Sequence, residues 1–260
     1  VCALTPDGPR QQNSESLGNF PHDGPVGPER MTHVLVVGTY HAEKGLVTVS
    51  RLVAILESIR PDVIFLELPC EALDDFLNGT RSNLESTAVR RYRENREVAL
   101  VPVDLPEPEA KFFREQQFLT QKIERTSRTY CRLVDDNAQR IEAFGFAYLN
   151  SERASEAWSA IDDEARDTVG WLVEREAVDH RRVVEAYESW THVNERREEA
   201  MLREIVHYSQ TQPFTKGVLL VGSAHRGSIL AKARERAGDG APRIDADISE
   251  FSEVLGEIPS

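Results

Sequence analysis

Two short apolar runs near opposite ends of the chain each stop at a Gly-x-x-His sequence. The first reads Val-Leu-Val-Val-Gly-Thr-Tyr-His and ends at His41, and the second reads Val-Leu-Leu-Val-Gly-Ser-Ala-His and ends at His225. Continuous Val and Leu residues are typical of a strand buried on both faces, as in a parallel sheet. Ligands of open parallel sheets bind at the carboxyl ends of the strands. Both histidines are therefore predicted at such an edge, with a helix beginning near Gly227.

Two further strands and the helix before them fit the same pattern. Residues 47–59 carry apolar side chains at helical spacing, which predicts an amphipathic helix. Apolar runs at 63–68 and 98–104 follow, and the acidic residues Glu67 and Asp104 lie near their carboxyl ends. Strand–helix–strand connections of this kind are right-handed by default. The chain is therefore predicted to be an α/β protein with a Rossmann-like, mostly parallel sheet.

The strand pattern is interrupted between the third and the last core strand. From 106 to 212 the sequence is highly charged, with sparse apolar residues at helical spacing, which predicts a large helical insertion. Its apolar seams are compatible with a lid or with a homodimer interface. The α/β core is then formed by 31–105 and 213–260. Residues 1–30 are rich in Pro, Gly, Asn, Gln and Ser and are predicted to be a disordered leader before Met31, a natural start.

Charge and cysteine content limit the class of protein. The net charge is −13, which argues against a broad nucleic-acid or anionic-membrane surface, because both need concentrated Lys and Arg. No apolar run approaches the roughly 20 residues that span a bilayer, and no secretory signal is visible. Cys2, Cys70 and Cys131 are widely separated and form neither a disulfide framework nor a zinc-thiolate motif. We therefore expect a cytoplasmic protein with no membrane span and no nucleic-acid partner.

The predicted strand ends combine residue types that can carry out chemistry. His41, Glu67 and His225 would share one edge, with Asp104 beside them. Two imidazoles and a carboxylate are a usual ligand set for a divalent metal that keeps open positions, and such a metal activates water. Alternatively, one histidine acts as a metal-free general base that a carboxylate orients. Glu67 also has a simpler interpretation, in which its strand is ending and its side chain points to water.

The glycine before each histidine suits either chemistry. Gly38 and Gly222 permit a sharp turn and let a ligand approach the backbone closely, so both are candidate cofactor-binding residues. A single Gly-x-x-His is weak evidence, but two copies directly behind buried strands are moderately specific. The sequence contains no GxxxxGK[ST], GxSxG, HExxH or GxGxxG motif, each of which would indicate a different site.

Taken together, these motifs resemble the TraB/Tiki family. The resemblance is carried by Gly-Thr-Tyr-His ending at His41, a Glu at the end of the second strand, Val-Pro-Val-Asp ending at Asp104, and Val-Gly-Ser-Ala-His-Arg-Gly around His225. Asn-Glu-Arg-Arg at 194–197 is similar to the family's Glu-Arg-Asp/Asn segment. The wider superfamily includes pheromone-shutdown proteins, erythromycin-esterase proteins and ChaN haem-binding lipoproteins. The similarity extends from Met31 to about Leu230.

The resemblance implies a Rossmann-like sheet with a helical insertion and a metal-dependent hydrolase. Family members are proposed to cleave peptides with Mn²⁺ or Co²⁺, and Zn²⁺ is an alternative ion here. Carried over, the site residues are His41, Glu67 and His225, and Asp104 is a further candidate ligand. Arg196 takes the role of an anion-binding or transition-state partner.

The chain also departs from the family pattern. The family often has an Arg about five residues after the Glu, where this chain has Ala72, and Arg197 stands where Asp or Asn follows Glu-Arg. The membrane-spanning helices of some members are absent. Glu43, two residues beyond His41, is a candidate replacement for the missing polar partner, or else a solvated loop residue.

Three functions follow from these alternatives. The leading one is a metal-dependent hydrolase that cleaves a peptide or a related amide or ester bond. The second is a metal-free esterase for a small molecule, with His41 as the base. The third is a protein that binds a peptide or haem without chemistry. Chelation separates the first from the second, and a haem titration identifies the third.

Overall fold

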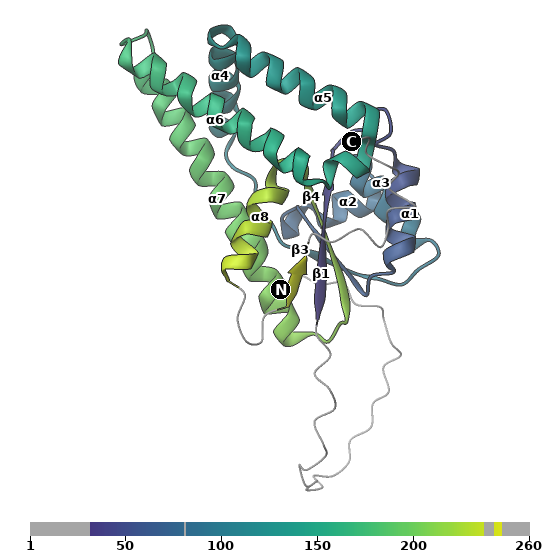
Figure 1. The fold of residues 1–260 in the computed structure, drawn as a ribbon. Helices are drawn as coiled ribbons and strands as arrows, with labels where there is room; N and C mark the ends of the chain where they lie inside the picture. Colours follow the sequence, from purple (N-terminus) through teal and green to yellow (C-terminus); the bar gives the residue numbers. More distant parts are fainter. Residues whose placement is uncertain (1–31, 81, 237–241, 246–260) are drawn as a thin grey trace, which may run out of the picture.

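Five parallel strands form one sheet, in the order β3-β2-β4-β1-β5. The computed structural model describes residues 32–80, 82–236 and 242–245. Figure 1 shows that the long helices extend beyond one end of the sheet. The strands are β1 (His33–Thr39), β2 (Val63–Leu66), β3 (Ala99–Pro102), β4 (Lys216–Gly222) and β5 (Arg243–Asp245). Every neighbouring pair is parallel. The predicted α/β class with a Rossmann-like parallel sheet is confirmed.

Strand β4 lies between β1 and β2 in the sheet. Gly222 of β4 pairs with Thr39 of β1, and Leu220 pairs with Leu66 of β2. Leu66 also pairs with Pro102 at the end of β3. The carboxyl ends of these four strands therefore lie at one edge of the sheet, which is the edge where open parallel sheets bind ligands.

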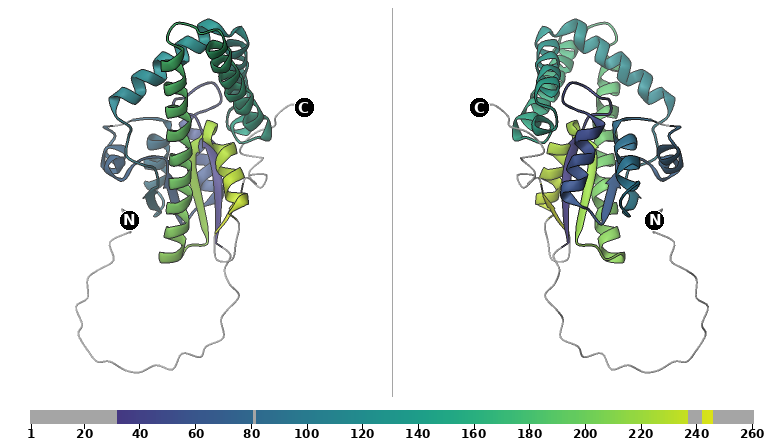
Figure 2. Two further views of the ribbon diagram at one scale, coloured as in Figure 1. Left: turned by 90° about the vertical axis from the view of Figure 1, so that its left-hand side faces the viewer. Right: turned by 90° about the vertical axis from the view of Figure 1, so that its right-hand side faces the viewer.

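Side chains of the central strands alternate between two hydrophobic layers. Leu35 and Val37 face the first layer, and Val34 and Val36 face the second, because successive residues of a strand point to opposite faces. The helices that cover the faces are α1 (Val49–Ile59) and α3 (Leu84–Arg93) on the first, with α8 (Ser223–Glu235) and the end of α7 (His180–Thr211) on the second. Figure 2 shows α1 across one face and α7 across the other.

The helices of the first layer begin at well-capped residues. The Thr48 hydroxyl accepts a hydrogen bond from the Arg51 N–H at the start of α1. Asn83 and Ser86 each accept a hydrogen bond from the other's backbone N–H at the start of α3. This cap fixes Glu85 in the first turn of α3. The short helices η1 (Cys70–Ala72) and α2 (Leu73–Asn78) lie between β2 and α3.

Four helices between β3 and β4 form the helical insertion. They are α4 (Ala110–Thr126), α5 (Arg128–Leu149), α6 (Glu152–Glu174) and α7. Helices α4, α6 and α7 share a small core that includes Leu119, Val169 and Val183. The insertion also reaches into the sheet layers, since the buried residues Phe146 of α5 and Met201 of α7 belong to the first and second layer. The insertion and the sheet are therefore packed as one body of structure.

Two sequence predictions differ from the described structure or lie outside it. Helix α8 begins at Ser223, four residues before Gly227, because the backbone turns helical directly after the N-cap residue Gly222. His225 consequently lies in the first turn of α8 and not in a loop. The predicted leader, residues 1–30, lies outside the described residues. Among the described helices, none is long and apolar enough to cross a membrane.

Candidate functional site

A cavity opens at the carboxyl edge of the sheet, where the sequence predicts a site. It has a volume of about 330 Å³ and lies between the strand ends and helices α4 and α7 of the insertion. Its polar lining includes His41, Glu67, Asp104 and Arg197. Three of these residues follow or end a strand, and the fourth comes from the insertion. The insertion therefore completes the site that the sheet begins.

Arg197 of α7 is the centre of a network of charges. Its Nε lies 3.1 Å from both carboxylate oxygens of Asp104, and its Nη2 lies 2.6 Å from Oδ2 of the same group. Nη2 also donates a hydrogen bond of 2.7 Å to Oε1 of Glu67. Burial lowers the pKa of Arg197, but the hydrogen bonds and charges of Asp104 and Glu67 outweigh it, and the pKa is raised. Arg197 is thus a permanent cation held between two acids.

Glu67 connects the end of β2 to the end of β4. Its Oε2 accepts a hydrogen bond of 2.6 Å from the backbone N–H of Gly222, while its Oε1 accepts from Arg197. The side chain is 8% exposed, so it does not point into bulk water. A buried carboxylate is costly unless it is paired. Both oxygens of Glu67 are paired.

His41 forms a pair with a glutamate of α3. Its Nδ1 lies 3.1 Å from Oε1 of Glu85, and the same oxygen accepts a 2.6 Å hydrogen bond from the Thr39 hydroxyl. The hydrogen bond with Glu85, aided by the charges of Glu85 and Glu67, raises the pKa of His41. Burial raises the pKa of Glu85, but the hydrogen bonds from His41 and Thr39 outweigh it, and the pKa is lowered. Each partner therefore favours the charged form of the other.

His225 forms a second histidine–glutamate pair. Its Nδ1 lies 2.8 Å from Oε1 of Glu198 of α7. The other oxygen of Glu198 accepts hydrogen bonds of 2.6 Å from Ser228 and from Lys232. Burial raises the pKa of Glu198, but these three hydrogen bonds outweigh it, and the pKa is lowered. The carboxylate favours the tautomer with a proton on Nδ1, and Nε2 of His225 lies 3.5 Å from Nη1 of Arg197.

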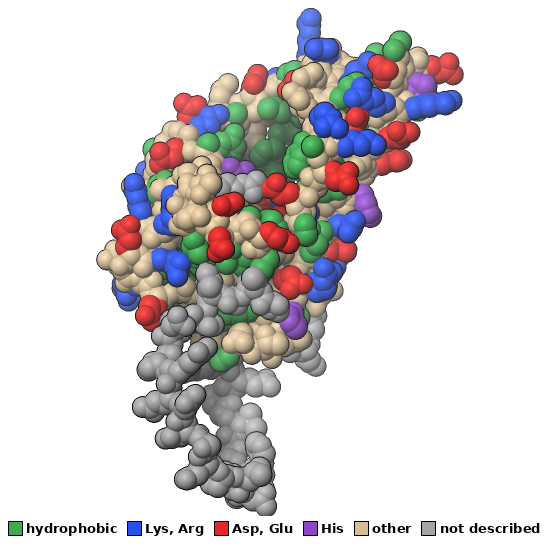
Figure 3. All heavy atoms as spheres, turned by 180° about the vertical axis from the view of Figure 1, so that it is seen from behind, with side chains coloured by type: hydrophobic (Ala, Val, Ile, Leu, Met, Phe, Trp, Pro, Cys, Tyr) green, Lys and Arg blue, Asp and Glu red, His purple; other side chains and the backbone are tan. Residues whose placement is uncertain are grey.

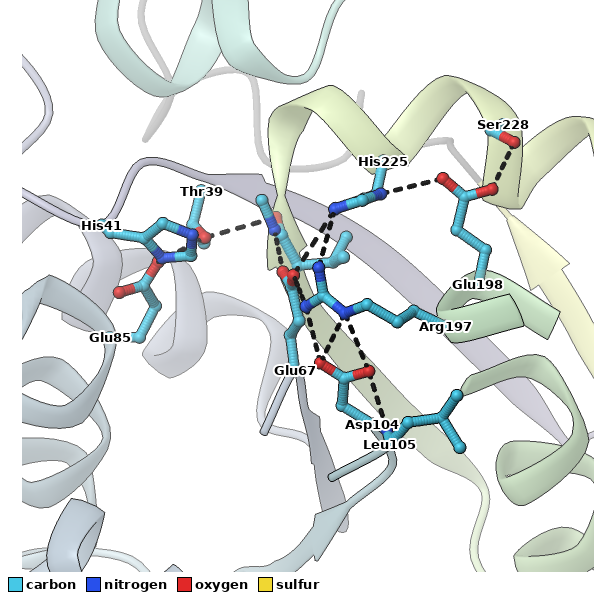
Figure 4. A network of polar contacts seen from close by, with 12 residues as sticks. Thr39, His41, Glu67, Glu85, Asp104, Leu105, Arg197, Glu198, His225 and Ser228 are labelled. Atoms are coloured by element: carbon cyan, nitrogen blue, oxygen red, sulfur yellow. Dashed lines mark hydrogen bonds and ion pairs between the residues drawn. The ribbon is translucent and has the colours of Figure 1, made fainter. Parts of the chain in front are cut away.

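The two imidazoles lie on either side of the Glu67 carboxylate (Figure 4). A Cβ atom on Gly222 would lie 3.4 Å from Oε2 of Glu67 and 3.6 Å from Nε2 of His41. On the other side, Nε2 of His225 lies 3.7 Å from Oε1 of Glu67. The structure therefore brings together His41, Glu67 and His225, with Asp104 one ion pair away through Arg197. Gly222 is the point at which these side chains approach the backbone.

Arg196 and Glu43, both predicted as site residues, have other surroundings. Arg196 is exposed, whereas its neighbour Arg197 lines the cavity and bonds to Glu67. Successive residues of a helix differ in direction by about 100°, and Arg197 shares a helix face with the buried Met201, four residues later. Glu43 accepts a 2.8 Å hydrogen bond from the Val49 N–H and thereby caps α1. We therefore assign the cation of the site to Arg197 and a structural role to Glu43.

Gly38 also has a packing role in place of the predicted ligand contact. Its N–H and C=O bond to the side chain of Asn150 at 2.6 and 3.1 Å. A Cβ atom on Gly38 would lie 2.9 Å from the Leu149 carbonyl oxygen and 3.1 Å from the Arg226 side chain. The glycine therefore lets the end of α5 pack directly against β1.

Sequence reasoning missed Glu85, Glu198 and the role of Arg197. All three lie on helices, so they lack the signal of a polar residue behind a buried strand. A signal did exist for Arg197 and Glu198, because each lies four residues before a large buried apolar residue, Met201 or Leu202, whereas the exposed Arg196 has only the small Ala200 at that spacing. Charged residues in the apolar stripe of a helix face the protein interior. Glu85 carries the same signal, because it lies four residues before the buried Val89 in the same helix.

The expected metal site of two histidines and a carboxylate needs available oxygen atoms on Glu67. Those oxygens are bonded to Arg197 and Gly222, and Asp104 is also bonded to Arg197. A guanidinium at this position also repels a second cation. Within residues 32–80, 82–236 and 242–245, no group of three or more His, Cys, Asp or Glu side chains is arranged to hold a metal ion. The residues in this arrangement do not fit that metal site.

No protein-family model matches the chain, and no curated protein or solved structure is significantly similar to it. The TraB/Tiki resemblance therefore stays a prediction. The geometry itself combines two imidazoles, each oriented by a carboxylate, with a fixed guanidinium beside a cavity. Such a set of groups can transfer protons and stabilise a negative charge that develops on a substrate oxygen.

Proposed function

We propose that the protein is a hydrolase of esters or amides that activates water with His41 and without a metal. One observation carries this proposal: Glu85 holds Nδ1 of His41, and the same cavity is lined by His41 and the cation Arg197. A carboxylate on one imidazole nitrogen orients the ring and supports proton transfer at the other nitrogen. A fixed cation in the cavity supports the charge that an attacked carbonyl develops.

In the proposed reaction, Nε2 of His41 accepts a proton from water while the water oxygen attacks the carbonyl carbon. The carbonyl oxygen becomes the oxyanion of a tetrahedral intermediate, and Nη1 of Arg197 donates a hydrogen bond to it. The intermediate then expels the alcohol or amine, and His41 returns its proton to that leaving group. An acid and an alcohol or amine are released, and the enzyme returns to its starting protonation state.

The remaining groups act through Arg197. Asp104 and Glu67 hold its Nε and Nη2, which leaves Nη1 for the oxyanion. Nε2 of His225 contacts Nη1 of Arg197, while Nδ1 of His225 contacts Glu198. We therefore regard these four as positioning residues. Pre-oriented donors of this kind need no rearrangement when the charge forms.

A second candidate is the metal-dependent hydrolase of the TraB/Tiki type. It is favoured by the carboxylate on Nδ1 of both His41 and His225, because metal-bound histidines usually have such a partner on their other nitrogen. In this function Arg197 would have to leave Glu67 so that Mn²⁺, Co²⁺ or Zn²⁺ could approach the carboxylate.

A hydrolysis screen of esters, amides and peptides after exhaustive chelation tests the proposal. We expect activity to survive chelation and to fall about 100-fold or more in His41→Ala. His192→Ala, a change of an exposed histidine on α7, is the matched control and should keep full activity. Loss on chelation with recovery on Mn²⁺ or Co²⁺ would favour the second candidate. Full activity in His41→Ala, or no hydrolysis of any compound, would overturn the proposal.

We also propose a cytoplasmic location and a substrate that is not a nucleic acid. The net charge of −13 argues against a nucleic-acid substrate, and three widely separated cysteines without the pattern of a disulfide framework support the location. A homodimer through the insertion is supported by Trp171 and Val178, which are exposed at the far end of α6 and before α7. Imaging of a fluorescent fusion tests the location, and light scattering of the purified protein tests the homodimer.

A further inference from the structure

The cavity beside His41 has an apolar part that the proposed reaction does not use. Phe76 of α2 and Phe112 and Phe113 of α4 line this part. From this lining we infer that the substrate is a small, uncharged ester that carries an aromatic group. The aromatic group packs against Phe112 while the ester carbonyl faces His41. This inference rests on the proposed hydrolase function, and its experiment separates the two.

The aromatic wall is incompletely covered by the protein itself. The rings of Phe112 and Phe113 pack edge to face with centroids 5.5 Å apart. Phe113 is 47% exposed and Phe112 is partly exposed, whereas Phe76 is 6% exposed. Aromatic rings gain from contact with another ring in stacked or edge-to-face geometry. An aromatic group in the cavity would cover this surface and extend the existing pair of rings.

The charges of the lining disfavour an anionic substrate. Among the residues that the structure describes, Glu67, Glu85, Asp104 and Glu107 line the cavity together with one arginine, Arg197. Arg197 is paired with Glu67 and Asp104, and His41 is paired with Glu85, so acidic groups outnumber basic ones among the described residues of the lining. On the face of the molecule in Figure 3, acidic side chains lie among hydrophobic ones. A carboxylate or phosphate on the substrate would be repelled, whereas an uncharged ester would not.

The size of the cavity indicates a small substrate. Its volume of about 330 Å³ is at the lower end of the range of roughly 300–1,000 Å³ for small-molecule sites. That volume accommodates a ring with a short ester, whereas an extended polypeptide would need a longer groove. Small esters therefore fit the cavity better than peptides as substrates of the proposed reaction.

Proton release from methyl esters measures the substrate preference directly. We expect kcat/KM for methyl phenylacetate to exceed that for methyl acetate by roughly tenfold or more, because the ring is buried on binding. Phe112→Ala should remove most of this ratio through KM. Trp171→Ala deletes an exposed ring of α6 that is not part of the lining and should keep the ratio. A ratio that is unchanged in a folded Phe112→Ala protein, as judged by thermal melting, would overturn the inference.

A ketone that cannot be hydrolysed separates binding from catalysis. Phenylacetone has the same ring as methyl phenylacetate and a ketone carbonyl at the position of the ester carbonyl. Calorimetry measures its binding to the wild type and to His41→Ala. We expect both to bind it and Phe112→Ala to bind several-fold more weakly. Phe112-dependent binding without ester hydrolysis would support the pocket and refute the hydrolase. Ester hydrolysis with no effect of Phe112 on either measurement would refute the pocket and leave the hydrolase standing.

Charge is tested with methyl 4-carboxyphenylacetate, the anionic analogue of the ester. We expect it to be a poorer substrate than methyl phenylacetate by about fivefold or more. Glu107→Lys should reduce this discrimination more than Glu109→Lys, because Glu107 lines the cavity and Glu109 is an exposed acid of the same loop outside the lining. Equal turnover of the two esters by the wild type would overturn the preference for uncharged substrates.

Discussion

Nδ1 of His41 and Oε1 of Glu85 lie 3.1 Å apart, between the loop after β1 and the first turn of α3. The His41 side chain is 65% exposed, whereas that of Glu85 is 8% exposed. A buried carboxylate thus holds an exposed imidazole by one nitrogen. The partner of one ring nitrogen determines the tautomer and the basicity of the other. The reactivity of His41 is therefore expected to depend on Glu85.

Glu85→Gln should lower the pKa of His41, because it removes the carboxylate hydrogen bond and charge that raise this pKa. A general base loses activity when it becomes protonated. The acid limb of the rate profile should consequently move to lower pH in the variant. NMR titration of the His41 ring measures the pKa directly. Glu94→Gln changes an exposed acid at the end of the same helix and should leave both quantities unchanged. An unaltered His41 pKa in Glu85→Gln would contradict this prediction.

The same pair should make the free energy of unfolding depend on pH. The pKa of His41 is raised above 6.5 in the folded state, so its contribution is complete below pH 6.5 and is lost as pH rises through the folded pKa. The pKa of Glu85 is lowered below 4.5, so its contribution is lost as pH falls through the folded pKa. The free energy of unfolding of the wild type in urea should therefore exceed that of His41→Gln by the largest amount between pH 4.5 and pH 6.5. The excess should stay below about 1 kcal/mol, because His41 is largely exposed. An excess that grows toward alkaline pH would refute the assignment.

Arg197→Met should destabilise the protein by about 3 kcal/mol, because it leaves the carboxylates of Glu67 and Asp104 buried without their cation. The free energy of unfolding in urea measures this loss. Arg196→Met is the matched control and should stay within about 0.5 kcal/mol of the wild type, since Arg196 is exposed. Adding Glu67→Gln to Arg197→Met should restore part of the stability. Equal losses of stability in Arg197→Met and Arg196→Met would contradict the ion-pair network around Arg197.

Glu198→Gln should lower kcat roughly tenfold with little change in KM, because an amide holds the Nδ1 proton of His225 less firmly than a carboxylate. The disturbed imidazole would then support Nη1 of Arg197 less well when the oxyanion forms. Steady-state kinetics separate the two constants. Glu199→Gln, a change of an exposed acid one position along α7, should leave both constants unaltered. A rise in KM at constant kcat in Glu198→Gln would mean that Glu198 serves binding instead.

The part of the site that lies at strand ends could be predicted from the sequence. Parallel strands end at one edge of a sheet, so polar residues directly behind buried runs converge there. His41, Glu67 and His225 meet for this reason, although 184 positions separate the two histidines in the chain. The apolar runs that end at these residues carry information on both fold and position.

The part of the site that lies on helices could not be predicted in the same way. Whether Arg196 or Arg197 faces the cavity depends on how α7 is rotated against the sheet, which is decided by packing of residues such as Met201. The spacing of Glu85 from the buried Val89 places Glu85 on the inward face of α3, but its contact with His41 depends on how α3 docks beside the loop after β1. The metal ion and the homodimer stay predictions.

The burial of Phe146 and Met201 in opposite layers of the sheet determines how this chain can be divided. A shortened protein without residues 106–212 would keep α1, α3 and α8 but would expose part of both apolar layers to water, and it should aggregate. It would also lose Arg197, and with it the counter-ion of Glu67. Neither the sheet without the insertion nor the insertion alone is therefore expected to fold independently. We expect the described chain to melt in one cooperative transition.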